Sequence, residues 1–118
     1  MTPALGRTLA SALSATVLAA GLALGAATPA SAATCPSSAS PKIPGAQAHW
    51  TLSCTGKRLK VYGWVEDTRA DGDCAFVSVS AGNGQNRVED ACGWGERRNF
   101  EFTFDGTKTA TARLYLDN

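Results

Sequence analysis

The chain has no excess of either charge. Its 118 residues carry 11 Lys and Arg against 10 Asp and Glu, for a formal net charge of +1. Nucleic-acid binding needs a basic surface that displaces counterions from phosphates, and this composition supplies none. Basic amphipathic helices of the kind that bind membrane surfaces are also missing. Beyond the N-terminal segment, we therefore expect neither a nucleic-acid partner nor a membrane partner.

Catalytic motifs are missing as well. The sequence contains no G-x-S-x-G nucleophile elbow, no glycine-rich phosphate loop and no HExxH motif. The only histidine, His49, lies in a segment with strand character and has no triad partners that the sequence singles out. Glu66 or Asp67 could pair with Glu89 or Glu101 for glycoside hydrolysis, but no pattern marks a buried acid among them. We expect a non-catalytic protein that needs no cofactor.

What the chain does contain is an N-terminal stretch typical of a secretory signal peptide. Arg7 supplies the positive charge, residues 9–25 form an apolar run, and residues 30–32 give the small-x-small pattern of a cleavage site. The alternative is a retained membrane anchor, but this run is short for a span and is interrupted by glycine. We expect residues 1–32 to be removed, which leaves a secreted, extracellular chain of one domain.

Four cysteines follow this segment: Cys35, Cys54, Cys74 and Cys92. An even number in a small exported chain indicates two disulfides, which support a core that is marginal at this size. Four cysteines allow three connectivities, and we favour Cys35–Cys54 with Cys74–Cys92 because each pair ties neighbouring segments. A zinc site is the alternative, but the chain has no C-x2-C spacing.

Helical periodicity is absent after residue 33, and short alternating segments separated by turn signals take its place. Residues 33–45, rich in Ser, Pro and Ala, are interpreted as an extended N-terminal arm held only through Cys35. Residues 46–118 form the predicted domain. Six strands are expected in it, at 46–54, 58–66, 74–81, 86–92, 97–104 and 109–116. The prediction is an all-β fold, a small antiparallel β-sandwich of Ig-like or jelly-roll-like type, and a monomer.

The alternation divides the apolar side chains into two sets. The expected core residues are Leu59, Val61, Val65, Ala75, Val77, Val79, Phe100, Phe102, Phe104, Ala112, Leu114 and Leu116. The outward faces are expected to carry five aromatic side chains, Trp50, Tyr62, Trp64, Phe76 and Tyr115.

Three aromatic residues are candidates for binding. Tyr62 and Trp64 are two residues apart on one strand, so their rings would form a platform for a sugar ring or a protein partner. The alternative is that Trp64 is a packing residue. Trp94 lies between two glycines directly after Cys92. It would either anchor a partner from a loop tip or fold back over the disulfide.

An acidic turn is the only metal candidate. Asp67, Asp71 and Asp73 lie on one predicted loop, and calcium prefers carboxylate and carbonyl oxygens. The EF-hand spacing is not met, and an acidic hairpin loop is the alternative. We therefore assign no metal and retain these residues as a weak calcium candidate.

Residues 63–75 (GWVEDTRADGDCA) and 91–95 (ACGWG) resemble a group of small exported actinobacterial proteins with two disulfides and no assigned activity. The resemblance extends over roughly residues 57–118. It implies a sandwich with a Cys74–Cys92 pair and supplies no catalytic residues. A looser similarity connects the chain to the proteinaceous α-amylase inhibitors. Their inhibitory Trp-Arg-Tyr tripeptide is missing, and the nearest stretch is residues 64–66.

Together these observations predict a secreted, non-catalytic binding or interaction module with a protein or glycan partner. One alternative is a secreted proteinaceous inhibitor of a hydrolase, whose rigid loop would enter the enzyme's cleft. The other is a small carbohydrate-binding protein.

Overall fold

The structure, a computed structural model, describes residues 31–118, and all regular elements in that range are β-strands. The strands are β1 (Ser31–Thr34), β2 (Ser37–Ala39), β3 (Lys42–Ile43), β4 (Ala46–Thr55), β5 (Arg58–Asp67), β6 (Cys74–Ala81), β7 (Asn86–Ala91), β8 (Arg97–Asp105) and β9 (Thr109–Asp117). The predicted signal peptide lies outside the described residues, apart from Ser31 and Ala32. Within the described range, no helix has the length and apolar character of a membrane span.

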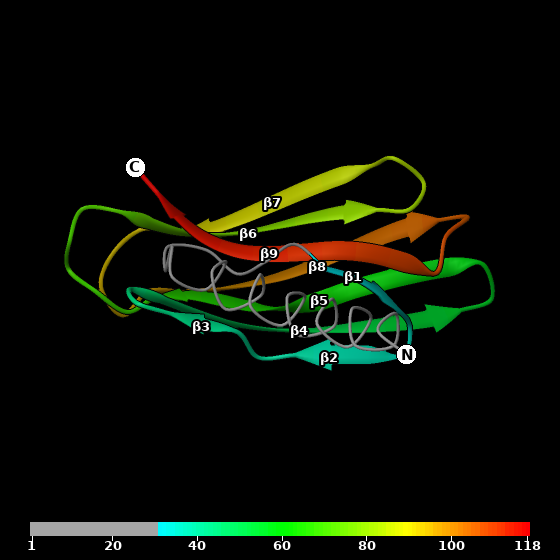
Figure 1. The fold of residues 1–118 in the computed structure, drawn as a ribbon, viewed down its shortest axis with the longest axis horizontal. Helices are drawn as coiled ribbons and strands as arrows, with labels where there is room; N and C mark the ends of the chain where they lie inside the picture. The colour runs from blue at the N-terminus through cyan, green and yellow to red at the C-terminus, as the bar shows by residue number, and fades with distance from the viewer. Residues whose placement is uncertain (1–30) are drawn as a thin grey trace, which may run out of the picture.

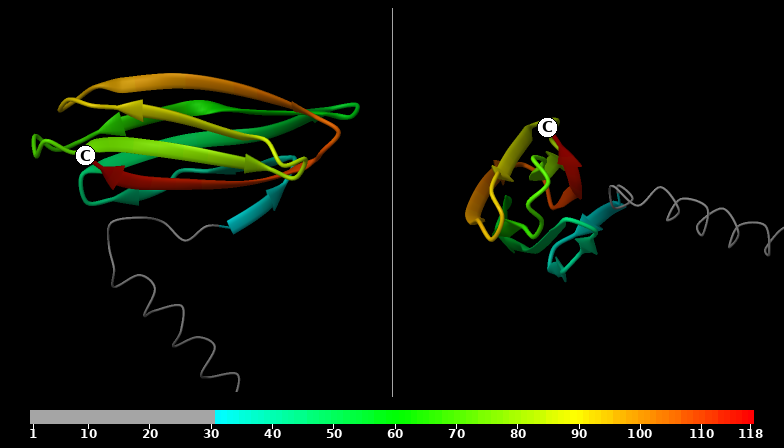
Figure 2. Two further views of the ribbon diagram at one scale, coloured as in Figure 1. Left: turned by 90° about the horizontal axis from the view of Figure 1, so that it is seen from above. Right: turned by 90° about the vertical axis from the view of Figure 1, so that its left-hand side faces the viewer.

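Two antiparallel sheets pack face to face, which confirms the predicted β-sandwich. One sheet has the order β1-β9-β6-β7, and the other has the order β2-β4-β5-β8 with β3 also paired to β4. The long strands run side by side along the molecule in Figure 1, and the end-on view of Figure 2 shows the two layers. The pairings β5–β8 and β6–β9 correspond to the B–E and C–F pairings of immunoglobulin sandwiches.

The six strands predicted from residue 46 onward correspond to β4–β9, each within one residue of the expected bounds. Alternating side chains of these strands fill the space between the sheets. All the expected core residues are buried except Phe102 and Leu116, which are partly exposed and pack against the others. The regular alternation of β5 and β8 therefore identified the core correctly.

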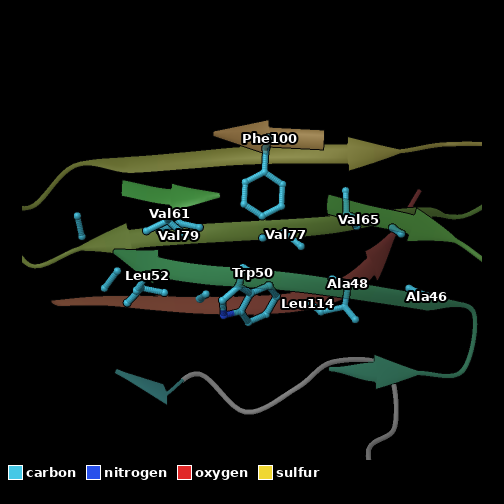
Figure 3. Close-up of a cluster of buried hydrophobic side chains, with 14 of the residues drawn as sticks. Ala46, Ala48, Trp50, Leu52, Val61, Val65, Val77, Val79, Phe100 and Leu114 are labelled. Atoms are coloured by element: carbon cyan, nitrogen blue, oxygen red, sulfur yellow. The ribbon is translucent and has the colours of Figure 1, made fainter. Parts of the chain in front are cut away.

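Trp50 was expected on an outward face, and that prediction is wrong. Its side chain is buried, and it lies among the aliphatic core residues in Figure 3. In β4 the inward positions are Ala46, Ala48, Trp50 and Leu52. Trp50 pairs across the sheet with Gly63, which has no side chain to occupy the space beside the indole ring.

The N-terminal arm is extended, but the expectation that only Cys35 holds it is wrong. β1 pairs with β9, and both β2 and β3 pair with β4, so the arm adds one strand to one sheet and two to the other. Cys35 lies between β1 and β2 in the chain, and its disulfide with Cys54 crosslinks the arm to β4. Ile43 of β3 is buried in the core. Predicted cleavage after Ala32 would leave the second half of β1 in place.

Gly63 lies in the middle of β5, between Trp50 of β4 and Phe100 of β8. A Cβ atom at this position would overlap the backbone carbonyl oxygen of His49. Only glycine therefore lets β4 approach β5 this closely while two aromatic rings fill the adjacent space.

We expect Gly63→Ala to lower the free energy of unfolding by about 2 kcal/mol, because the new methyl group must push two backbones apart. Chemical denaturation followed by circular dichroism measures the change. Gly56→Ala is the comparison, because a Cβ there meets no atom within 4 Å. Gly56 has a φ of +61°, so its substitution costs only the left-handed backbone strain, about 1 kcal/mol. Equal effects of the two substitutions would show that the close approach at Gly63 does not matter.

Candidate functional site

Two loops meet at the end of the sandwich that carries the C-terminus. The β5–β6 loop (68–73) and the β7–β8 loop (92–96) both lie there, at the left of Figure 1. The Cys74–Cys92 disulfide, predicted above and confirmed in the structure, joins the roots of these loops. A crosslink at this point restricts how far the loops can separate.

Asp67, the last residue of β5, fixes the β7–β8 loop. Its side chain is only 1% exposed. One carboxylate oxygen accepts a hydrogen bond from the Gly93 N–H at 2.9 Å, and the other accepts one from the Arg69 N–H at 3.1 Å. A buried carboxylate is tolerable only when such donors replace its lost water.

The backbone of Asp67 adds two further hydrogen bonds to the same loop. Its N–H donates to the Glu96 carbonyl at 3.0 Å, and its carbonyl accepts from the Gly95 N–H at 2.7 Å. Glu96 closes the loop, since its carboxylate accepts from the Cys92 N–H at 2.7 Å. These bonds tie the five-residue loop to the end of β5 and so oppose its local opening.

Trp94 projects from the tip of this loop with 75% of its surface exposed. Gly95 has a φ of +83°, which lets the chain reverse directly after the tryptophan. Among the described residues, no aromatic ring or cation is stacked on the Trp94 indole. Of the two expected arrangements for Trp94, the structure has the projecting one.

A shallow cavity of about 340 Å³ separates Trp94 from the β5–β6 loop. The cavity is lined by Gly93 and Trp94 of the β7–β8 loop, by Asp67 and by the Cys74–Cys92 disulfide. The β5–β6 loop contributes Arg69, Ala70, Gly72 and Asp73. Volumes of this size are at the low end for ligand-binding pockets, about 300–1,000 Å³.

Only one of the two rings in the predicted aromatic platform on β5, that of Tyr62, is exposed. Tyr62 is 41% exposed on the outer face of its sheet. Trp64 shares that face but is partly buried, because the Arg97 guanidinium carbon lies 3.7 Å from its ring centroid. The structure therefore brings Tyr62 and Trp64 onto one face and places Trp94 separately, on an end loop.

The Arg97 guanidinium is also paired with Glu66. It donates two hydrogen bonds to one carboxylate oxygen of Glu66, at 2.7 and 2.9 Å. This interaction lowers the pKa of Glu66 below its ordinary value, against the opposing effect of burial. The stabilisation it gives is present above the ordinary pKa of a glutamate and is lost as the pH falls through the lowered pKa.

The carboxylates of the three aspartates in the weak calcium candidate do not share one set of partners. Asp67 is committed to loop N–H groups, and one carboxylate oxygen of Asp71 accepts from the Asp73 N–H at 3.0 Å. The one group of metal-ligand atoms found in residues 31–118 is Cys74, Asp90 and Cys92. Both of these cysteines are in a disulfide, so they offer no thiolate to a metal.

His49 lies on the outer face of β4. Its Nδ1 is 2.7 Å from the Ser40 hydroxyl, and its ring centroid lies 6.4 Å from that of Trp64. Within the described residues, no carboxylate hydrogen-bonds to the imidazole, as the third member of a triad would. The contact between Ser40 and His49 therefore links the segment after β2 to β4.

Sequence reasoning did not find the role of Asp67. The available signal was an aspartate at a strand end, followed by a distant glycine-flanked loop. Only the fold brings these two segments together.

No family model matches this chain, and no curated protein or solved structure shows significant similarity to it. The resemblances noted in the sequence therefore stay predictions.

Proposed function

We propose that this protein is an extracellular, non-catalytic binding module that contacts a protein partner through the Trp94 loop. One observation carries the proposal. A large aromatic side chain, 75% exposed, projects from a loop that a disulfide and a buried aspartate hold in place.

The physical argument concerns the cost of binding. Exposed tryptophan is unusual, since large aromatic residues are mostly buried in folded proteins. Tryptophan is also among the residues that contribute most to protein interfaces. Because the loop is already ordered, little conformational entropy is lost when the indole enters a pocket of the partner.

The extracellular assignment has two supports. The described chain contains two disulfides and no free cysteine, which is consistent with an oxidising environment. The N-terminal sequence predicts export. Expression from the full-length gene followed by mass spectrometry of the secreted product tests this assignment, and Ala33 is the expected first residue.

A hydrolase inhibitor is the special case in which the partner is an enzyme and the Trp94 loop enters its cleft. The carbohydrate-binding alternative would use Tyr62 and Trp64 instead. Arg97 already occupies one face of the Trp64 ring, so a sugar could stack only on Tyr62 without displacing it. We therefore favour a protein partner.

We expect Trp94→Ala to weaken partner binding by about 30-fold, the ~2 kcal/mol of an interface hot spot, with an unchanged melting temperature. The oxidised protein, immobilised on a sensor surface, is tested against purified secreted proteases, glycosidases and insoluble glycans. Val88→Ala is the matched control, since Val88 is 54% exposed on the edge strand β7.

Two results would contradict the proposal. One is binding that survives Trp94→Ala unchanged. The other is binding only to glycans with loss on Tyr62→Ala, which would establish the carbohydrate alternative.

A further inference from the structure

Charge is distributed unevenly between the two ends of the sandwich. All acidic residues of the described chain except Glu101 and Asp105 lie in the half that carries Trp94. Several lysines and arginines lie at the opposite end, where the β4–β5 and β8–β9 turns contain Lys57 and Lys108. The Trp94 end therefore attracts cationic partners over a distance of about a Debye length, ~8 Å at physiological salt.

The residues that line the cavity beside Trp94 also favour a cationic ligand. Asp73 lines it, and within residues 31–118 its carboxylate makes no hydrogen bond or ion pair. Trp94 lines it too, and its indole has no stacked cation among the described residues. An unstacked indole and a free carboxylate in the lining of one small cavity suit a positively charged group.

We propose that this cavity takes a lysine or arginine side chain of the partner protein. The cationic head would lie between the Trp94 ring and the Asp73 carboxylate, and the aliphatic stem would pack against Ala70 and the Cys74–Cys92 disulfide. The inference rests on the proposed function, because it names the group that the same loop meets.

Arg69 also lines the cavity, and it opposes such a ligand. Its side chain is exposed and makes no ion pair among the described residues. A bound lysine or arginine is therefore expected to hold its charge near Asp73 and Trp94 and away from the Arg69 guanidinium. Removal of the Arg69 charge should strengthen binding, whereas substitution of Asp73 or Trp94 should weaken it.

The test uses nuclear magnetic resonance spectra of the oxidised protein, expressed from the full-length gene and labelled with nitrogen-15. The probes, at millimolar concentration, are the Nα-acetyl methylamides of lysine, arginine, norleucine and glutamate. Norleucine has the lysine stem without the charge. The indole N–H of Trp94 reports on the cavity, and those of Trp50 and Trp64 are internal controls.

We expect saturable shifts of the Trp94 indole and of the amides of 69–74 with the lysine and arginine probes, and none with norleucine or glutamate. Asp73→Asn should weaken binding about threefold and Arg69→Gln should strengthen it about twofold. Trp94→Ala should remove the amide shifts. Glu101→Gln, the same charge change at a distance from the cavity, should have no effect.

Three outcomes would overturn the inference: equal binding of norleucine and lysine, preferential binding of glutamate, or equal effects of Asp73→Asn and Glu101→Gln. If partner binding still depends on Trp94 in that case, the proposed function stands with a different ligand group. If the lysine probe binds as expected but Trp94→Ala leaves partner binding unchanged, the cavity is a cation site and the proposed function fails.

Discussion

Reduction of both disulfides is expected to unfold this domain at room temperature. The two crosslinks join cysteines 19 and 18 residues apart, and loops of this length each stabilise by about 3 kcal/mol in the chain-entropy model. Folded domains are stable by only about 5–15 kcal/mol in total, and small ones lie at the low end. Loss of roughly 6 kcal/mol therefore removes most or all of the stability.

Thermal melting followed by far-ultraviolet circular dichroism, with and without a phosphine reductant, measures this effect. For a domain of this size, the expected fall in melting temperature exceeds about 25 °C. The paired variants Cys35→Ser with Cys54→Ser, and Cys74→Ser with Cys92→Ser, separate the two contributions. Because Cys54 lies beside the β4–β5 turn and Cys74 beside the last residue of β9, the disulfides are at opposite ends of the sandwich and their effects should add. A reduced protein that melts within a few degrees of the oxidised one would contradict this account.

Most of the sandwich could be predicted from the sequence because its long strands alternate regularly. In β5 and β8 every second residue is apolar across most of the strand, which identifies both the strand and its buried face. The two disulfides were predictable for a related reason, since each pair joins segments that are neighbours in the chain.

The N-terminal arm could not be predicted in the same way. β1, β2 and β3 contain only four, three and two residues, too few for a period to be recognised. They are strands because β4 and β9 present unpaired edges to them, which is a property of the assembled sheets. Trp50 illustrates a different difficulty: its neighbour across the sheet is Gly63, a pairing that only the assembled strands show.

The candidate site was predictable in composition but not in arrangement. Glycines on both sides of Trp94 indicated a loop, and exposure of the tryptophan was one of two expected arrangements. Asp67 was grouped with Asp71 and Asp73 as a metal candidate because the three are close in sequence. In the structure, burial and two backbone donors give Asp67 a role that its exposed neighbour Asp71 does not have.

The second large effect is expected for Asp67→Ala. The substitution leaves the N–H groups of Gly93 and Arg69 without their acceptor at a buried position, and each such loss costs about 1–3 kcal/mol. We expect a total of about 3 kcal/mol, somewhat below the sum because water can enter near the loop. Asp67→Asn should cost less, since one oxygen remains to accept and only one donor loses its partner.

The structural consequence should be concentrated in the Trp94 loop. Because Asp67 holds this loop by both side chain and backbone, its removal should speed hydrogen exchange at the Gly93 and Gly95 amides far more than in β5 or β8. Partner binding should weaken beyond the loss of stability, since the indole must then be ordered on binding. Asp71→Ala is the control, because the Asp71 side chain is exposed and its carboxylate accepts a hydrogen bond only from the Asp73 N–H of the same loop. Equal exchange rates at Gly93 in the two variants would show that the disulfide alone, without the aspartate, fixes the position of Trp94.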